Sequence, residues 1–305
     1  MFGWDDIKSG ASNLFHSAAE LAPRAAAQVG GAAPAPVDPE LAEQMRDRAQ
    51  AAQALQGRFK IDDDPAHANG NNVVSSEEYQ RIVELYSDIR RGRTDLRLAG
   101  SEAFGTDPAQ QKNMEAFRSG AMDDIADILQ TSSGRELIGT LAHNYGGIEG
   151  DHITTIGRTA HGNPSAADTD EYYSPEIHYE PGRDATDGLN LPGHEYTDDL
   201  RLRSDVTLYH ELVHAYHATH GDEDTETADT LGYQSPLDVG HWLRPSHAGA
   251  ESQAVGLGPF GELSRFSENM YRGERQAIGA SNIGERARGG SDDDMKLRDH
   301  YNVIL

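Results

Sequence analysis

The stretch "TLYHELVHAYHATHG", residues 207–221, holds four histidines and one glutamate within fifteen positions. Its residues His210, Glu211 and His214 form the pattern H-E-x-x-H. Residues four apart on a helix lie on one face, so both imidazoles can reach one metal ion. Glu211 lies beside the first imidazole, where it can take the proton of the water molecule that the ion activates. The pattern predicts zinc-dependent hydrolysis, with two histidine ligands and Glu211 as the general base.

A catalytic zinc site takes three protein ligands and keeps a fourth position open. The chain has no cysteine, so the third ligand must be another His, Asp or Glu. We expect it to be Glu251, which lies 37 residues after His214. Glu251 opens a short Ala-rich helix with the pattern E-x-x-A, similar to the second helix of glutamate-liganded zincins. Glu268, in "FSENMYRGE", is the alternative ligand.

The remaining polar residues near the motif leave several roles open. His217 follows His214 by three positions and could fill the open position, which would make the zinc structural. His220 lies too far along the helix to join the pair, and the acidic run at residues 221–230 is expected to be a solvated loop. Candidates for stabilising the oxyanion of the tetrahedral intermediate are Tyr271, Arg272, His241 and Tyr301, and Asp229 could orient a ligand histidine.

The histidine motif needs a helix, and its flanks supply the signals for one. Ser204 can cap the N-terminus, Asp205 suits the first turn, and Gly221 suits the position after the last turn. Upstream, hydrophobic spacing predicts helices at residues 38–57 and 75–92. Asp38 caps the first, and Ser75 with Glu78 resembles a capping box at the second. Two further helices are expected within residues 114–144, broken near Thr131–Gly134.

The pattern then changes to β-like runs at residues 151–159 and 175–182, separated by turn-rich residues 160–170. The order of helices, then a few strands, then the helix with the histidine motif predicts an α+β fold that is mostly helical and has a small sheet. The segment "EIHYEPG" could align an extended substrate by strand addition.

Composition narrows the partners that the chain can bind. The formal net charge is -25, from 51 acidic and 26 basic residues. Such a surface disfavours nucleic-acid binding through a basic patch and adhesion to an anionic membrane, and it suits a basic protein partner. No stretch approaches the roughly 20 apolar residues of a membrane span. A non-enzymatic acidic interaction module with a structural zinc is the alternative function.

The segments "LYHELVHAYHATHG", "ESQAVGLG", "SENMYRGERQAIG" and "LRDHY" together resemble the bacterial effector metallopeptidase family typified by NleD. The resemblance covers roughly residues 110–301. It implies a zincin-like fold of the gluzincin type, one Zn²⁺, and the roles given above for His210, Glu211 and His214. It also implies a secreted effector or toxin that cleaves a protein in the cytoplasm of a host or target cell. The substrate is left open.

The expected organisation is a flexible leader at residues 1–38 and one metallopeptidase domain at residues 39–305. The domain has a helical part, residues 39–145, and a catalytic part, residues 146–305. The leader carries acidic residues early and lacks the apolar segment of a Sec-type signal. Secretion would therefore use another route, with the leader as a signal that engages the secretion apparatus, or else the leader is a disordered tail.

Overall fold

The computed structural model describes residues 38–64, 66, 71–100, 107–143, 152–158, 165–168, 174–182, 203–220, 248–256 and 264–278. The chain divides into two units, residues 1–47 and residues 48–305. The account below concerns the second unit, apart from the first turns of helix α2. Within the described ranges, no helix is long and apolar enough to cross a membrane.

The first two described helices begin at the caps that the sequence predicts. Helix α2 (Pro39–Ala54) follows Asp38, whose carboxylate accepts a backbone hydrogen bond from the first turn. Helix α3 (Ser76–Arg91) follows Ser75, whose hydroxyl accepts one in the same way. Gly92 ends α3 in the left-handed conformation, with φ of 66°. The helices predicted at residues 38–57 and 75–92 are confirmed.

Two long helices follow, separated as expected. Helix α4 (Pro108–Ile128) begins at a capping box, and helix α5 (Ser132–His143) starts after a three-residue break. The turn between them is tight. A side chain at Gly134 would collide with the carbonyl oxygen of Ile128, so only glycine fits there. The break predicted near Thr131–Gly134 is confirmed, and it lies at residues 129–131.

Four strands form one mixed sheet in the order β3-β4-β6-β5. Strands β3 (Leu96–Leu98), β4 (Thr154–Arg158) and β6 (Pro175–Tyr179) run parallel, and β5 (Ser165–Asp168) is antiparallel to β6 at one edge. A second, two-stranded parallel pair consists of Lys60–Ile61 (β1) and Val73–Val74 (β2).

Strand β5 corrects one expectation. Residues 160–170 were expected to form turns, yet Ser165–Asp168 pairs with β6 over four positions, from Ser165 opposite His178 to Asp168 opposite Pro175. The segment Ser-Ala-Ala-Asp lacks the β-branched and aromatic residues that mark a strand in sequence. Its conformation is set by backbone hydrogen bonds to β6, which is a non-local cause.

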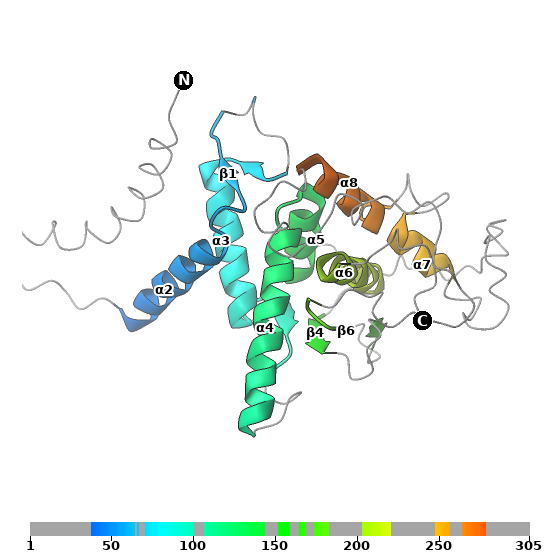
Figure 1. Ribbon diagram of the computed structural model, residues 1–305, viewed down its shortest axis with the longest axis horizontal. Coiled ribbons are helices and arrows are strands. Elements are labelled where there is room, and N and C mark those ends of the chain that lie inside the picture. The colour runs from blue at the N-terminus through cyan, green and yellow to red at the C-terminus, as the bar shows by residue number, and fades with distance from the viewer. Residues whose placement is uncertain are drawn as a thin grey trace, which may run out of the picture. The chain divides into compact units, whose positions relative to one another are not determined.

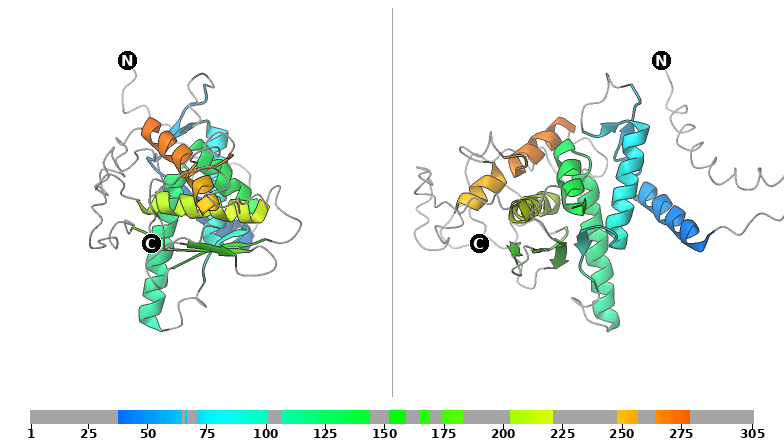
Figure 2. Two further views of the ribbon diagram at one scale, coloured as in Figure 1. Left: turned by 90° about the vertical axis from the view of Figure 1, so that its right-hand side faces the viewer. Right: turned by 180° about the vertical axis from the view of Figure 1, so that it is seen from behind.

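Helix α6 (Ser204–His220) lies at the centre of the second unit. It packs against β5 and β6 on one side and against α4, α5, α7 (Ala248–Val255) and α8 (Glu268–Ile278) elsewhere. Figures 1 and 2 show α6 between the four-stranded sheet and α8. Thirteen of its seventeen residues are buried. The helix that carries the histidine motif is therefore a core element.

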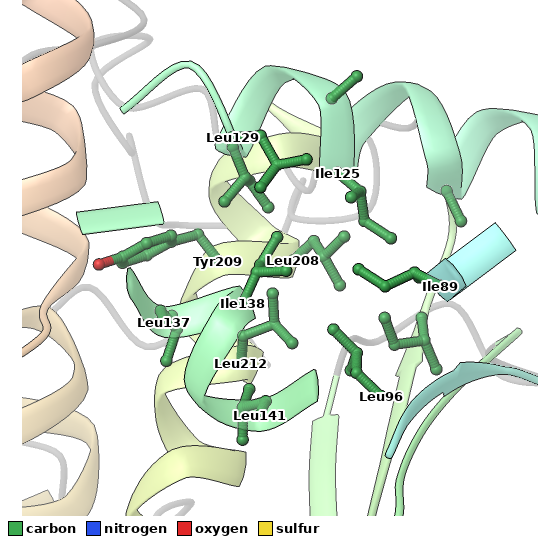
Figure 3. Close-up of a cluster of buried hydrophobic side chains, with 14 of the residues drawn as sticks. Ile89, Leu96, Ile125, Leu129, Leu137, Ile138, Leu141, Leu208, Tyr209 and Leu212 are labelled. Carbon is green, nitrogen blue, oxygen red and sulfur yellow. The ribbon is translucent and has the colours of Figure 1, made fainter. Parts of the chain in front are cut away.

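The hydrophobic core joins α6 to the helices and strands that come long before it in the chain. Leu208 and Leu212 of α6 are fully buried and pack in the same cluster as residues of α3, α4, α5 and β3. Figure 3 shows this cluster around α5 and α6. Its labelled residues are Ile89, Leu96, Ile125, Leu129, Leu137, Ile138, Leu141, Leu208, Tyr209 and Leu212.

The N-cap expected at Ser204 is wrong. Ser204 is the first residue of α6, and its hydroxyl donates to the carboxylate of Asp124 in α4, at 3.0 Å. Asp124 is buried, with 1 % exposure, so its carboxylate needs donors from inside the protein. The same carboxyl group also lies 3.5 Å from the hydroxyl of Tyr179.

Replacing Leu96 by alanine tests whether β3 is part of this core. Leu96 is fully buried, so Leu96→Ala should lower the free energy of unfolding by about 2–5 kcal/mol in urea titrations. Leu41→Ala is the matched control, since Leu41 is 51 % exposed and its loss should change the value by less than about 0.5 kcal/mol. Equal effects from the two substitutions would contradict the packing.

Candidate active site

The two motif histidines point their outer ring nitrogens at each other. Nε2 of His210 and Nε2 of His214 lie 3.1 Å apart, with the ring planes at 76°. Two nitrogens bound to one tetrahedral zinc ion, at bond lengths of about 2.0–2.1 Å, lie about 3.3–3.4 Å apart. Imidazole nitrogen is also a donor that zinc accepts readily. The pair therefore has the spacing and the chemistry of two ligands of one ion.

The same pair lies on the part of α6 that is partly exposed to solvent. The residues of α6 that are not buried are His210, His214, Ala218 and His220. The first three follow one another at intervals of four, so they form one stripe along the helix. An otherwise buried helix is thus accessible along the line that carries the two imidazoles.

The inner nitrogen of His210 is held by a buried carboxylate. Nδ1 of His210 lies 3.0 Å from Oε2 of Glu268, and Oε1 of Glu268 accepts from Nε of Arg272 at 2.7 Å. The side chains of Glu268 and Arg272 are both fully buried. The alternative ligand Glu268 is therefore placed against Nδ1, on the other side of the ring from the nitrogen that faces His214.

Helix α8 presents one polar face to α6. Glu268, Tyr271, Arg272 and Arg275 follow the helical spacing i, i+3, i+4 and i+7, and all four are buried. The hydroxyl of Tyr271 donates to Asp205 of α6 at 2.6 Å. The ring of Tyr271 also stacks on that of Tyr209 in α6, with centroids 4.5 Å apart.

Asp205 is the meeting point of the charges buried under α6. Besides Tyr271, it accepts from Nε of Arg203 at 3.0 Å, and Arg275 lies 3.9 Å away. Arg203 in turn lies 3.9 Å from Asp127 of α4. Opposite charges therefore alternate from α4 through α6 to α8, and each one offsets the desolvation of the next.

Of the other predicted site residues, Glu211 is buried on α6, and Glu251 lies in α7, which packs against α6. Glu251 was expected to open this helix, but the helix begins at Ala248. The side chain of Glu251 lies outside the described residues. His217 is buried, with 2 % exposure, and does not join the His210–His214 pair. Within the part of the chain that the structure describes, no three His, Asp or Glu side chains form a group that could hold a metal ion.

The match to a known family agrees with this layout. The peptidase M91 family, described as effector protein, matches residues 106–277. This is more than half of the chain. The chain belongs to the M91 peptidase family. No curated protein and no solved structure matches it.

The M91 match runs from the residue before the α4 cap to the last turn of α8, so it contains all the elements that surround the two histidines. Helices α2 and α3 and strands β1 to β3 precede it. Strand β3 nonetheless pairs with β4, and Leu96 packs in the common core. Strand β3 is thus part of the same folded unit as the peptidase segment.

Two of the four candidates for stabilising the oxyanion lie among the described residues. Tyr271 and Arg272 are fully buried, and they are bonded to Asp205 and Glu268. They support α6 from inside the protein and are not directed at a substrate. His241, Tyr301 and the proposed orienting residue Asp229 lie outside the described residues.

Sequence reasoning missed the role of α8. Its face of Glu, Tyr and two Arg residues has the composition of a solvated helix surface. One signal was available, since Glu268 and Arg272 have opposite charges at a spacing of four, as paired residues do. Asp205 was expected only to suit the first turn of the helix. It is instead the partner of Arg203, just before α6, and of Tyr271 and Arg275 in α8.

Tyr271 also gives the protein a sensitivity to high pH. Burial, and then the neighbouring Asp205 charge, raise the pKa of Tyr271 well above its usual value of 10.0. In the unfolded chain this phenol ionises near pH 10, whereas in the folded protein it stays protonated. Its contribution to stability is therefore complete below pH 10 and is lost as the pH rises from 10 toward the folded pKa.

Tyr271→Phe should accordingly flatten the fall in unfolding free energy above pH 10, measured by urea titration at a series of pH values. At pH 7 the same substitution should cost about 1–3 kcal/mol, because Asp205 loses a buried donor. Parallel pH curves for the two proteins would contradict the raised pKa.

Proposed function

We propose that the protein is a zinc-dependent endopeptidase. The observation that carries this proposal is the pair of Nε2 atoms of His210 and His214, 3.1 Å apart on the solvent-accessible stripe of α6. A structural zinc site is closed by four protein ligands, whereas a catalytic one keeps a position open to water and substrate. The accessible stripe favours the catalytic site over the alternative of a non-enzymatic module with a structural zinc.

The arrangement of elements supports a zincin-like fold of the gluzincin type. The motif helix α6 lies against a mixed sheet that ends in an antiparallel edge strand, and α7 packs on α6 with Glu251 in its sequence. Glu251 is proposed as the third ligand. The carboxylate of Glu268 has both oxygens engaged by His210 and Arg272, which leaves Glu251 as the better choice.

The chemistry would be divided between the ion and α6. Bound Zn²⁺ would supply the Lewis acid that polarises the scissile carbonyl and lowers the pKa of water. Glu211, next to His210, would take the proton from the attacking water and later pass it to the leaving amine. Its burial places this carboxylate where bulk water does not compete for the proton.

The substrate-aligning role cannot belong to the segment that the sequence suggested. Residues 176–179 of the segment "EIHYEPG" lie in β6, which is paired with β4 on one side and β5 on the other, so they offer no edge to a peptide. Strand β5 is one of the two edge strands of the sheet, and it contacts α6. We assign the alignment of an extended substrate to β5.

A peptidase of an effector family acts on a protein, and the proposed setting is the cytoplasm of a host or target cell. The net charge of -25 suits a substrate with a basic surface and disfavours nucleic acid. The proposed leader at residues 1–38, which would engage a secretion apparatus, lies outside the described residues except for Asp38.

Metal content and turnover test the catalytic proposal together. The purified wild type should contain about one zinc per chain by mass spectrometry, and His210→Ala with His214→Ala should contain none. Glu211→Gln should keep the zinc but lose at least about 100-fold in peptide hydrolysis, as expected for a lost general base. A Glu211→Gln protein with full activity, or a wild type that takes up no zinc, would end the proposal.

The third ligand can be tested by zinc affinity. Loss of a residue that only hydrogen-bonds to a metal ligand weakens metal binding by about 10–100-fold. Glu251→Gln should weaken zinc binding by more than this, because it removes a ligand. The readout is competition with a chromophoric chelator. Glu40→Gln, an exposed carboxylate at the start of α2, is the control and should bind zinc like the wild type. Equal affinities for the two variants would exclude Glu251.

A further inference from the structure

Glu268 has an environment that fits neither a surface carboxylate nor a metal ligand. It is the first residue of α8 and is fully buried. One oxygen faces Nδ1 of His210 at 3.0 Å, and the other accepts from Arg272 at 2.7 Å. A fully buried carboxylate is costly unless it is paired and hydrogen-bonded, and these two contacts meet that condition.

The contact with Glu268 determines which nitrogen of His210 carries the proton. An ionised carboxylate only accepts hydrogen bonds, so Nδ1 must be the donor. In the neutral ring Nε2 then has no proton, and its lone pair points toward Nε2 of His214. This is the tautomer that can bind a metal ion through Nε2.

Arg272 fixes the orientation of the Glu268 carboxylate. A guanidinium only donates, so it requires an acceptor oxygen from Glu268 on its side. It also balances the carboxylate charge in the interior. The carboxylate is therefore turned so that its second oxygen meets His210.

The rest of α8 is fixed to α6 and α7, so Glu268 cannot move away easily. Tyr271 is bonded to Asp205 and stacked on Tyr209. Directly before Glu268, Ser267 lies against the end of α7: Gly256 there has φ of 82°, and a Cβ on it would lie 2.5 Å from Oγ of Ser267. This close approach of α7 to the residue before Glu268 is open to glycine alone.

The geometry points to Glu268 as the positioning residue of the metal centre, with Arg272 as its support. Glu268 sets the tautomer and ring orientation of His210, and it does so before any ion binds. The inference rests on the proposed zinc site and adds to it a residue that neither coordinates the ion nor contacts the substrate.

Glu268→Gln tests the inference because the amide cannot serve both neighbours as the carboxylate does. Arg272 takes the amide oxygen, so the NH₂ group is left facing His210 and forces Nδ1 to accept. The proton then moves to Nε2 and blocks it. Zinc affinity, measured by chelator competition on the metal-free full-length protein, should fall by about 10–100-fold.

A second substitution should reverse part of this loss. In Glu268→Gln with Arg272→Met, no guanidinium holds the amide oxygen, which can turn to accept from Nδ1 of His210. The double variant should therefore bind zinc more tightly than Glu268→Gln alone, although it has lost more native contacts. It also removes both buried charges together, which a folded protein tolerates better than one unpaired charge.

Glu274→Gln is the matched control for loss of a carboxylate on the same helix. Glu274 accepts from the backbone N–H and the hydroxyl of Ser133 at the start of α5, at 3.0 and 2.9 Å. Its loss should lower the melting temperature but leave zinc affinity unchanged. A fall in zinc affinity equal to that of Glu268→Gln would show that the effect is only structural and would overturn the inference.

Two other results would also overturn it. Wild-type affinity in Glu268→Gln would show that His210 needs no partner, and loss as complete as in His210→Ala, without recovery in the double variant, would make Glu268 a ligand. These outcomes leave the zinc site itself intact. A wild type that binds no zinc would instead refute the proposed function and this inference together.

Discussion

The burial of α6 is the constraint on which the rest of this structure depends. A helix that carries ionisable side chains through a hydrophobic core loses their hydration, and the loss must be offset by partners inside the protein. Asp205 and His210 find those partners on α8, and Leu208 and Leu212 supply the apolar contacts toward α5. One side of α6 is thus stabilised by packing and another by paired charges, while the stripe with both imidazoles stays accessible.

Local patterns allowed much of this to be predicted. The helices begin at caps such as Asp38 and Ser75, and the H-E-x-x-H spacing places His210 and His214 on one face. In each case the cause lies within about one helical turn of the residue concerned. The strands β4 and β6 were recognised because their β-branched and aromatic residues face a buried side of the sheet.

What sequence reasoning missed has non-local causes. Strand β5 exists because of its pairing with β6, and Ser204 donates to Asp124, eighty positions earlier, instead of capping its own helix. The polar face of α8 is interior because Asp205 and His210 lie opposite it. Nothing in the sequence around Glu268 distinguishes a buried carboxylate from a solvated one, since the partner that matters is 58 residues away.

The position of β3 has a consequence for any shortened form of this protein. The match to the M91 family starts at residue 106, but the backbone of β4 is covered on one side by β3, which ends at Leu98. A chain without β3 would present the bare edge of a parallel strand, with Ile156 beside it in the core. Such edges pair with other chains, so the family segment alone would tend to self-associate into aggregates. Strand β3 is itself an edge strand, but it has three residues against the five of β4, so it leaves a shorter edge for another chain to pair with.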